Sequence, residues 1–175
     1  MDQESLLAFV RYHAWATDRV MMTAAALTDE ELRRPVDLDH GSAFDTIRHL
    51  VDVDWSWRQF CAGKDVGQTY AWDHGYTLDD LPALHTFTLE EDARLRSYVW
   101  SLDQAALDER LVMSEDPDDT IPRWLILAHV VNHGTDHRTE LARYLTDRGH
   151  SPGDLELLDA LTLAWPVGGG EPTAG

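Results

Sequence analysis

The chain has 175 residues, a length typical of one domain, and 43% of them are hydrophobic, which is enough for a single folded core. Its fourteen basic residues, of which Lys64 is the sole lysine, are outnumbered by thirty-two acidic residues, and the net charge is −18. This balance argues against DNA or RNA as a ligand, because nucleic-acid binders cluster Lys and Arg against phosphates. It also disfavours an anionic membrane surface as a partner.

No targeting or membrane-spanning segment is predicted. The first residues, Met1 to Glu4, are acidic, unlike the basic start of a secretory signal. The apolar runs, such as 124–128, are far shorter than the ~20 residues that a membrane span needs. Cys61 is the single cysteine, so no internal disulfide can form, and we expect it to be a small core residue. These features predict a cytoplasmic protein.

Apolar residues at steps of three and four predict four long helices, because that spacing places them on one face of a helix. The helices are expected over residues 4–27, from Ser42 to Gly63, over 80–100 and over 123–148. Each has a single apolar stripe, which must be buried against the others. The predicted fold class is therefore all-α, a four-helix bundle.

Shorter elements are predicted between and after these helices. Capping-box patterns at Thr28–Glu31 and Ser101–Gln104 each predict the start of a short helical piece. Residues 63–77 have no period and are expected to form a loop, whereas 111–121 form either a small hairpin or a loop.

The C-terminal end is expected to add one short helix within 154–164. A single bundle domain is then predicted for residues 1–166. Residues 167–175, which are rich in Gly, are expected to be a disordered tail.

Three of the nine histidines, His129, His133 and His137, lie at steps of four in the fourth helix. Residues i and i+4 are about 5–6 Å apart at Cβ on one helix face, so two imidazoles at this spacing can bind one metal ion. At this histidine content such a triplet is expected by chance only about 0.02 times. The triplet therefore predicts a metal site.

The apolar face of the fourth helix includes His133 and His137, which are expected to point into the bundle. Further ligands must come from another helix, and periodicity leaves His13 and His49 as alternatives. A zinc-peptidase site is excluded, because Gly134 stands where that motif has its glutamate. Asp136 is expected to point away from the metal. The remaining histidines are expected on the surface or in loops: His40, His74, His85 and His150.

The chain resembles the DinB-like family of four-helix bundles, which includes bacillithiol- and mycothiol-dependent S-transferases. Residues 12–19 match the family's Tyr-x-x-Trp-Ala-x-x-Arg pattern, and 47–55 are similar to its His-Leu segment followed by an acidic and an aromatic residue. Residues 127–138 resemble its signature His-x-x-x-His-x-x-x-His-Arg. The resemblance covers nearly the whole chain.

The resemblance implies that one histidine of the second helix joins two of the fourth, so the ligands are His49, His133 and His137. It leaves His129 as an outer-shell or core residue. It also implies a cytoplasmic, stress-related protein that commonly forms homodimers. Arg138 is interpreted either as a contact for the carboxylate of a thiol cofactor or as a member of a surface salt bridge.

A site with three imidazoles leaves coordination positions open for water or substrate, as in catalytic metal centres. Zinc suits these ligands, with nickel, iron or manganese as alternatives. The favoured hypothesis is transfer of a low-molecular-weight thiol to a small electrophile. The alternatives are a hydrolase that uses the same site and a non-catalytic metal-binding dimer.

Overall fold

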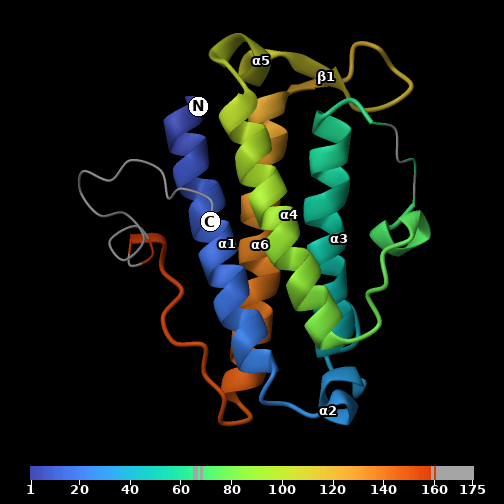
Figure 1. Ribbon diagram of the computed structural model, residues 1–175, viewed down its shortest axis with the longest axis vertical. Helices are drawn as coiled ribbons and strands as arrows, with labels where there is room; N and C mark the ends of the chain where they lie inside the picture. Colours follow the sequence, from blue (N-terminus) through green and yellow to red (C-terminus); the bar gives the residue numbers. More distant parts are fainter. Residues whose placement is uncertain (65–66, 68, 159, 161–175) are drawn as a thin grey trace.

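Four long helices form a bundle in which the first and last run in one direction and the second and third run in the other, as Figure 1 shows. The computed structural model describes residues 1–64, 67, 69–158 and 160. The long helices are α1 (Gln3–Ala24), α3 (Ala43–Cys61), α4 (Leu81–Ser101) and α6 (Arg123–Thr146). In the packing, α1 and α3 each contact both α4 and α6. The predicted all-α four-helix bundle is confirmed.

Side-chain caps determine where the helices begin. The Ser42 hydroxyl accepts the backbone N–H of Asp45 at 3.0 Å at the start of α3, and Asp80 accepts that of Ala83 at 2.8 Å at the start of α4. The predicted capping box at Thr28 is present and begins α2 (Asp29–Arg33). The predicted box at Ser101–Gln104 is wrong. Ser101 is the last residue of α4, and Asp103 caps α5 (Gln104–Asp108).

Small elements cross the ends and one side of the bundle. The segment 111–121 forms a hairpin, in which β1 (Arg110–Val112) pairs antiparallel with β2 (Thr120–Pro122). The predicted loop 63–77 contains a short 3-10 helix, η1 (Ala71–His74). The expected C-terminal helix is described at residues 157, 158 and 160, which are helical. Residues 154–156 of the predicted range are not helical, whereas 159, 161–164 and the 167–175 tail lie outside the described part of the chain.

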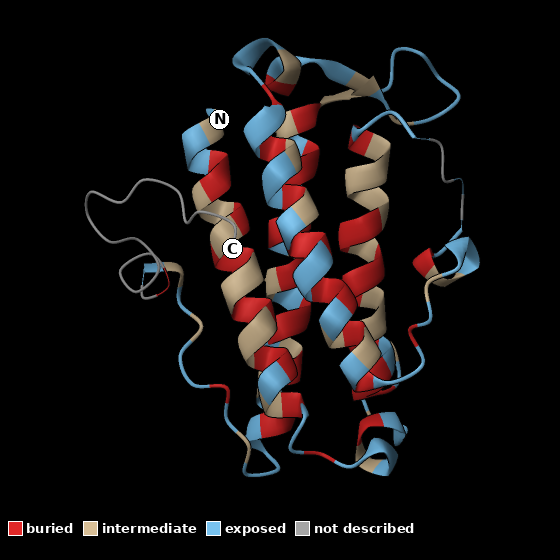
Figure 2. Cartoon of the chain, in the orientation of Figure 1, coloured by how far each residue is buried: buried red, intermediate tan, exposed pale blue. Residues whose placement is uncertain are grey.

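The core is built from the stripes that the sequence pattern predicts, and Figure 2 shows the buried residues turned inward on all four long helices. Ile126 and Val130 of α6 are at most 3% exposed, as are Leu6 and Val10 of α1. Cys61 is a buried core residue, and burial raises the pKa of its thiol to about 12.

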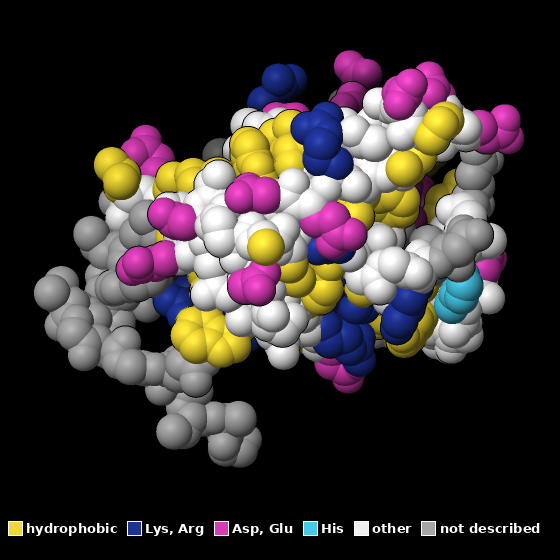
Figure 3. Space-filling model, turned by 90° about the horizontal axis from the view of Figure 1, so that it is seen from above, with side chains coloured by type: hydrophobic (Ala, Val, Ile, Leu, Met, Phe, Trp, Pro, Cys, Tyr) yellow, Lys and Arg dark blue, Asp and Glu magenta, His cyan; other side chains and the backbone are white. Residues whose placement is uncertain are grey.

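Acidic side chains lie on the surface (Figure 3), as expected for a chain with a net charge of −18. On the end of the bundle seen in Figure 3, acidic side chains are scattered among basic and hydrophobic ones. Within the described ranges, no helix is both long enough and apolar enough to cross a bilayer.

Candidate metal centre

Two neighbouring helices bring three histidines together. His49 lies in the first half of α3, and His133 and His137 lie one turn apart on α6. Because α3 and α6 pack against each other, the three rings meet at the contact between them. The structure thus selects His49, not His13, as the residue of the first two long helices that joins the α6 pair.

The ring nitrogens of these histidines converge. The Nε2 atom of His133 lies 3.1 Å from Nε2 of His49 and 3.1 Å from Nε2 of His137. Two nitrogens that each lie 2.0–2.1 Å from one ion, at angles of 90–109°, are roughly 2.9–3.4 Å apart. The observed separations match the spacing of ligands that share one metal ion.

The Nε2 atoms, and not the Nδ1 atoms, are the ring nitrogens that could bind a shared cation. A neutral imidazole has one N–H, and a metal-bound imidazole presents its lone pair to the ion and carries the proton on its other nitrogen. The Nδ1 atoms of His133 and His137 are buried and have no hydrogen-bond partner among the described residues. The three Nε2 atoms face each other instead of a carboxylate or a backbone carbonyl. These residues therefore fit a divalent ion at the shared point.

Burial keeps the rings in the neutral form that binds metals. Desolvation, with His40 and His137 nearby, lowers the pKa of His49 to about 4. Desolvation, with His137 and His49 nearby, lowers the pKa of His133 to about 3. Both imidazoles are therefore unprotonated at neutral pH, and a metal ion would displace no proton from their Nε2 lone pairs.

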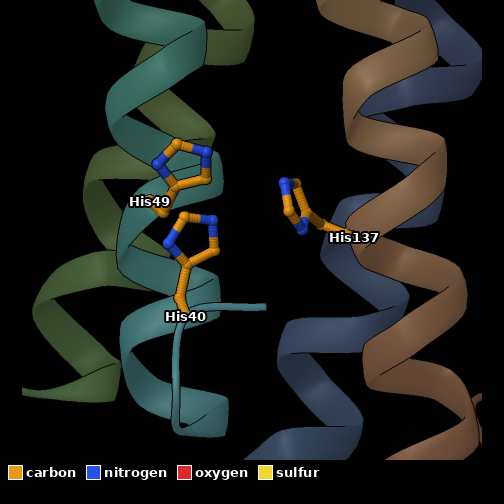
Figure 4. A group of neighbouring side chains, drawn as sticks. All are labelled: His40, His49 and His137. Carbon is orange, nitrogen blue, oxygen red and sulfur yellow. The ribbon is translucent and has the colours of Figure 1, made fainter. Parts of the chain in front are cut away.

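A fourth histidine, His40, also belongs to this cluster, although the sequence predicts it on the surface or in a loop. It lies in the loop before α3 and is half-buried. Its ring stacks on that of His49, with centroids 3.8 Å apart, and lies 5.1 Å from the ring of His137 (Figure 4). Periodicity could not find His40, because it lies outside a helix. The one sequence feature that could have pointed to His40 is its position two residues before Ser42, which caps α3.

The other two histidines of the helical stripes have different surroundings. His129 is exposed, its ring is 5.9 Å from that of His133, and Trp57 packs edge-on against it. Its expected place in the core is therefore wrong. His13 is fully buried between α1 and α3, where its Nε2 lies 2.8 Å from a carboxylate oxygen of Asp54. Asp136 is exposed, as predicted.

Of the two interpretations of Arg138, the surface salt bridge is wrong, because the side chain is only 1% exposed. Its guanidinium donates to Nδ1 of His13 at 2.8 Å, to the hydroxyl of Thr17 at 3.1 Å and to that of Thr135 at 3.0 Å. These contacts join α6 to α1 and hold the guanidinium in the interior. Adjacent residues of α6, His137 and Arg138, thus face different interior sites about 100° apart.

Comparison with known proteins adds a family assignment to this geometry. The model of the family described as "DinB family" matches residues 1–172, nearly the whole chain. No curated protein matches the chain.

Proposed function

The chain belongs to the DinB family, and from this membership and its cluster of imidazoles we propose that it is a metal-dependent thiol S-transferase. The proposed ligands are His49, His133 and His137, and the observation that carries the proposal is that Nε2 of His133 lies 3.1 Å from Nε2 of each of the other two. Zinc is the proposed ion, because three neutral imidazoles suit it.

A divalent ion held there lowers the pKa of a coordinated thiol or water, which supplies a nucleophile near neutral pH. The role of the chain is to hold the three imidazoles neutral and correctly spaced at the contact between α3 and α6. His49 and His133 are both partly exposed, so small molecules can approach the ion from solvent. In the proposed reaction the S–H bond of an external thiol breaks and its proton passes to solvent. The sulfur bonds to an electrophilic carbon as the bond from that carbon to its leaving group breaks, and the leaving group departs as an anion.

The sulfur nucleophile is proposed to come from an external molecule because the chain offers no suitable thiol. Cys61 is 1% exposed, and burial keeps its thiol protonated at neutral pH. It also lies at the end of α3, three turns of helix beyond His49. A low-molecular-weight thiol is therefore the proposed co-substrate.

Metal analysis tests the ligand set. Purified protein is expected to hold one equivalent of divalent metal, and His49→Ala and His133→Ala are expected to lose it. The matched control is His85→Ala, since His85 lies away from the cluster and bonds Asp18 at 2.7 Å. Unchanged metal content in both site variants would rule out the ligand set.

Turnover assays test the reaction class. Consumption of an electrophile such as monochlorobimane should require both the metal and an added thiol, with loss of activity in His49→Ala. Metal-dependent turnover of an ester without any thiol would instead identify a hydrolase. A chelator that lowers the melting temperature while neither activity is detectable would identify a non-catalytic metal protein.

A further inference from the structure

The loop between α2 and α3 is fixed in place around His40. The backbone N–H of Val36 donates to the carbonyl of Gly41 at 2.8 Å, and the N–H of Gly41 donates to that of Leu38 at 2.8 Å. Gly41 has φ +80°, a conformation that favours glycine, and it lets the chain turn directly into the Ser42 cap of α3. The loop is therefore a closed, hydrogen-bonded turn.

The same loop is also tied to α6. The N–H of Asp39 donates to Oε1 of Glu140 at 2.7 Å. Glu140 lies one turn after His137, and its second oxygen, Oε2, is 3.6 Å from Nδ1 of that histidine. This oxygen is buried, and no described residue forms a hydrogen bond with it. One carboxylate thus joins the loop that carries His40 to the helix that carries His137.

The contact places His40 within reach of the candidate metal centre. One ring nitrogen of His40, one of His49 and one of His137 lie within 4.8 Å of one another. In Figure 4 the rings of His40 and His49 lie side by side, and His137 faces both from α6. Nitrogens that share one ion are roughly 2.9–3.4 Å apart, so coordination needs the His40 ring to turn out of its stack toward the ion.

We propose that His40 is a fourth protein ligand of the metal centre, held there by the contact between Asp39 and Glu140. This inference rests on the proposed function, because it adds to the ligand set His49, His133 and His137. His40 differs from those three in lying on a loop, whereas they are held by helices α3 and α6. It is therefore the ligand that can be exchanged for an incoming substrate without moving a helix.

A gain-of-signal variant tests the proposal. The probe is Co²⁺, added to the metal-free full chain of the wild type and of His40→Cys. If residue 40 reaches the ion, the variant shows a thiolate-to-cobalt charge-transfer band in the near ultraviolet that the wild type lacks. Cys61 adds no such background, because it is buried and protonated in both proteins. Bound cobalt without this band would overturn the proposal.

Loss-of-ligand variants provide the second measurement. His40→Ala is expected to weaken Co²⁺ binding about tenfold or more, since loss of even an outer-shell partner costs about 10–100-fold. Glu140→Ala is expected to weaken Co²⁺ binding by a smaller factor, and His85→Ala is expected to leave the binding unchanged. Circular dichroism of the metal-free proteins checks that each variant is folded.

The outcomes separate this inference from the proposed function. If His49→Ala and His133→Ala lose the metal while His40→Ala keeps the wild-type affinity and spectrum, the fourth ligand is wrong and the three-histidine site stands. If none of these variants changes metal binding, both proposals fail.

Discussion

Nη1 of Arg138 lies 2.8 Å from Nδ1 of His13 in the interior of the bundle, and this contact determines the protonation of the histidine. A guanidinium can only donate, so Nδ1 of His13 must accept. The proton of the neutral ring is then on Nε2, which donates to Asp54 at 2.8 Å. The chain Arg138–His13–Asp54 links a buried cation to a buried carboxylate through one oriented imidazole.

Gly134 makes room for this contact. A Cβ atom at this position would lie 2.5 Å from Nη1 of Arg138 and 2.7 Å from Nδ1 of His13, inside normal van der Waals separation. A Gly-to-Ala change inside a helix ordinarily stabilises by about 0.5–1 kcal/mol. For Gly134→Ala we expect the opposite sign, a loss of about 1–3 kcal/mol from overpacking, measured by urea denaturation. Asp136→Ala, an exposed position on the same helix, is the control; a Gly134→Ala protein as stable as the wild type would contradict the prediction.

Removing the charge of Arg138 should destabilise the protein much more than removing a surface arginine. Arg138→Met leaves the buried carboxylate of Asp54 without its cation, and loss of one member of a buried pair costs about 3–5 kcal/mol. Arg34→Met breaks an exposed pair with Glu30, which contributes about 0–1 kcal/mol. Chemical denaturation compares the two variants, and equal losses would show that the interior pair is not stabilising.

Asp92 gives the stability a specific pH dependence. Burial, and then the nearby carboxylate of Asp54, raises the pKa of Asp92 to about 8. Between about pH 4 and 8 the folded chain therefore retains a proton that the unfolded chain releases, and the contribution of Asp92 to stability falls as the pH rises through this range.

The neutral variant Asp92→Asn removes this dependence. Its melting temperature minus that of the wild type is expected to increase steadily from pH 5 to pH 9. Asp136→Asn, an exposed change of the same charge, should show a flat difference over that range. A flat difference for Asp92→Asn as well would show that Asp92 is ionised in the folded protein.

Metal binding should stabilise the folded chain. An ion that binds the folded state and is present at 100 times its Kd adds about 2.7 kcal/mol. We expect zinc to raise the melting temperature of metal-free wild type and of His85→Ala, and to have little effect on His49→Ala. Scanning calorimetry in the presence of zinc or a chelator makes the comparison, and an equal shift in all three proteins would place the ion elsewhere.

Cys61 is expected to be unreactive in the folded protein. Its thiol is buried and its pKa is raised to about 12, so the reactive thiolate is scarce at neutral pH. Alkylation by iodoacetamide should proceed only after addition of denaturant, and Cys61→Ala should retain thiol-transfer activity. Rapid labelling of the native protein, or loss of transfer in the folded variant, would show that this cysteine takes part in the reaction.

Local sequence patterns determine the helices of this protein and two residues of its candidate site, His133 and His137. The apolar stripes, the caps at Thr28 and Ser42 and the spacing of His133 and His137 depend on contacts within about four residues. Such contacts follow from the rise and turn of a helix, so they can be predicted from the order of residues.

The relations between elements were decided by the tertiary structure alone. How α1 and α3 rotate against α6 determines that His49 meets the pair His133 and His137 while His13 meets Asp54 and Arg138. The fold of a loop, stabilised by the hydrogen bond from Asp39 to Glu140 across 101 positions of sequence, brings His40 to the same cluster. These contacts depend on packing between distant segments, and helical periodicity carries no information about which distant side chains it brings together.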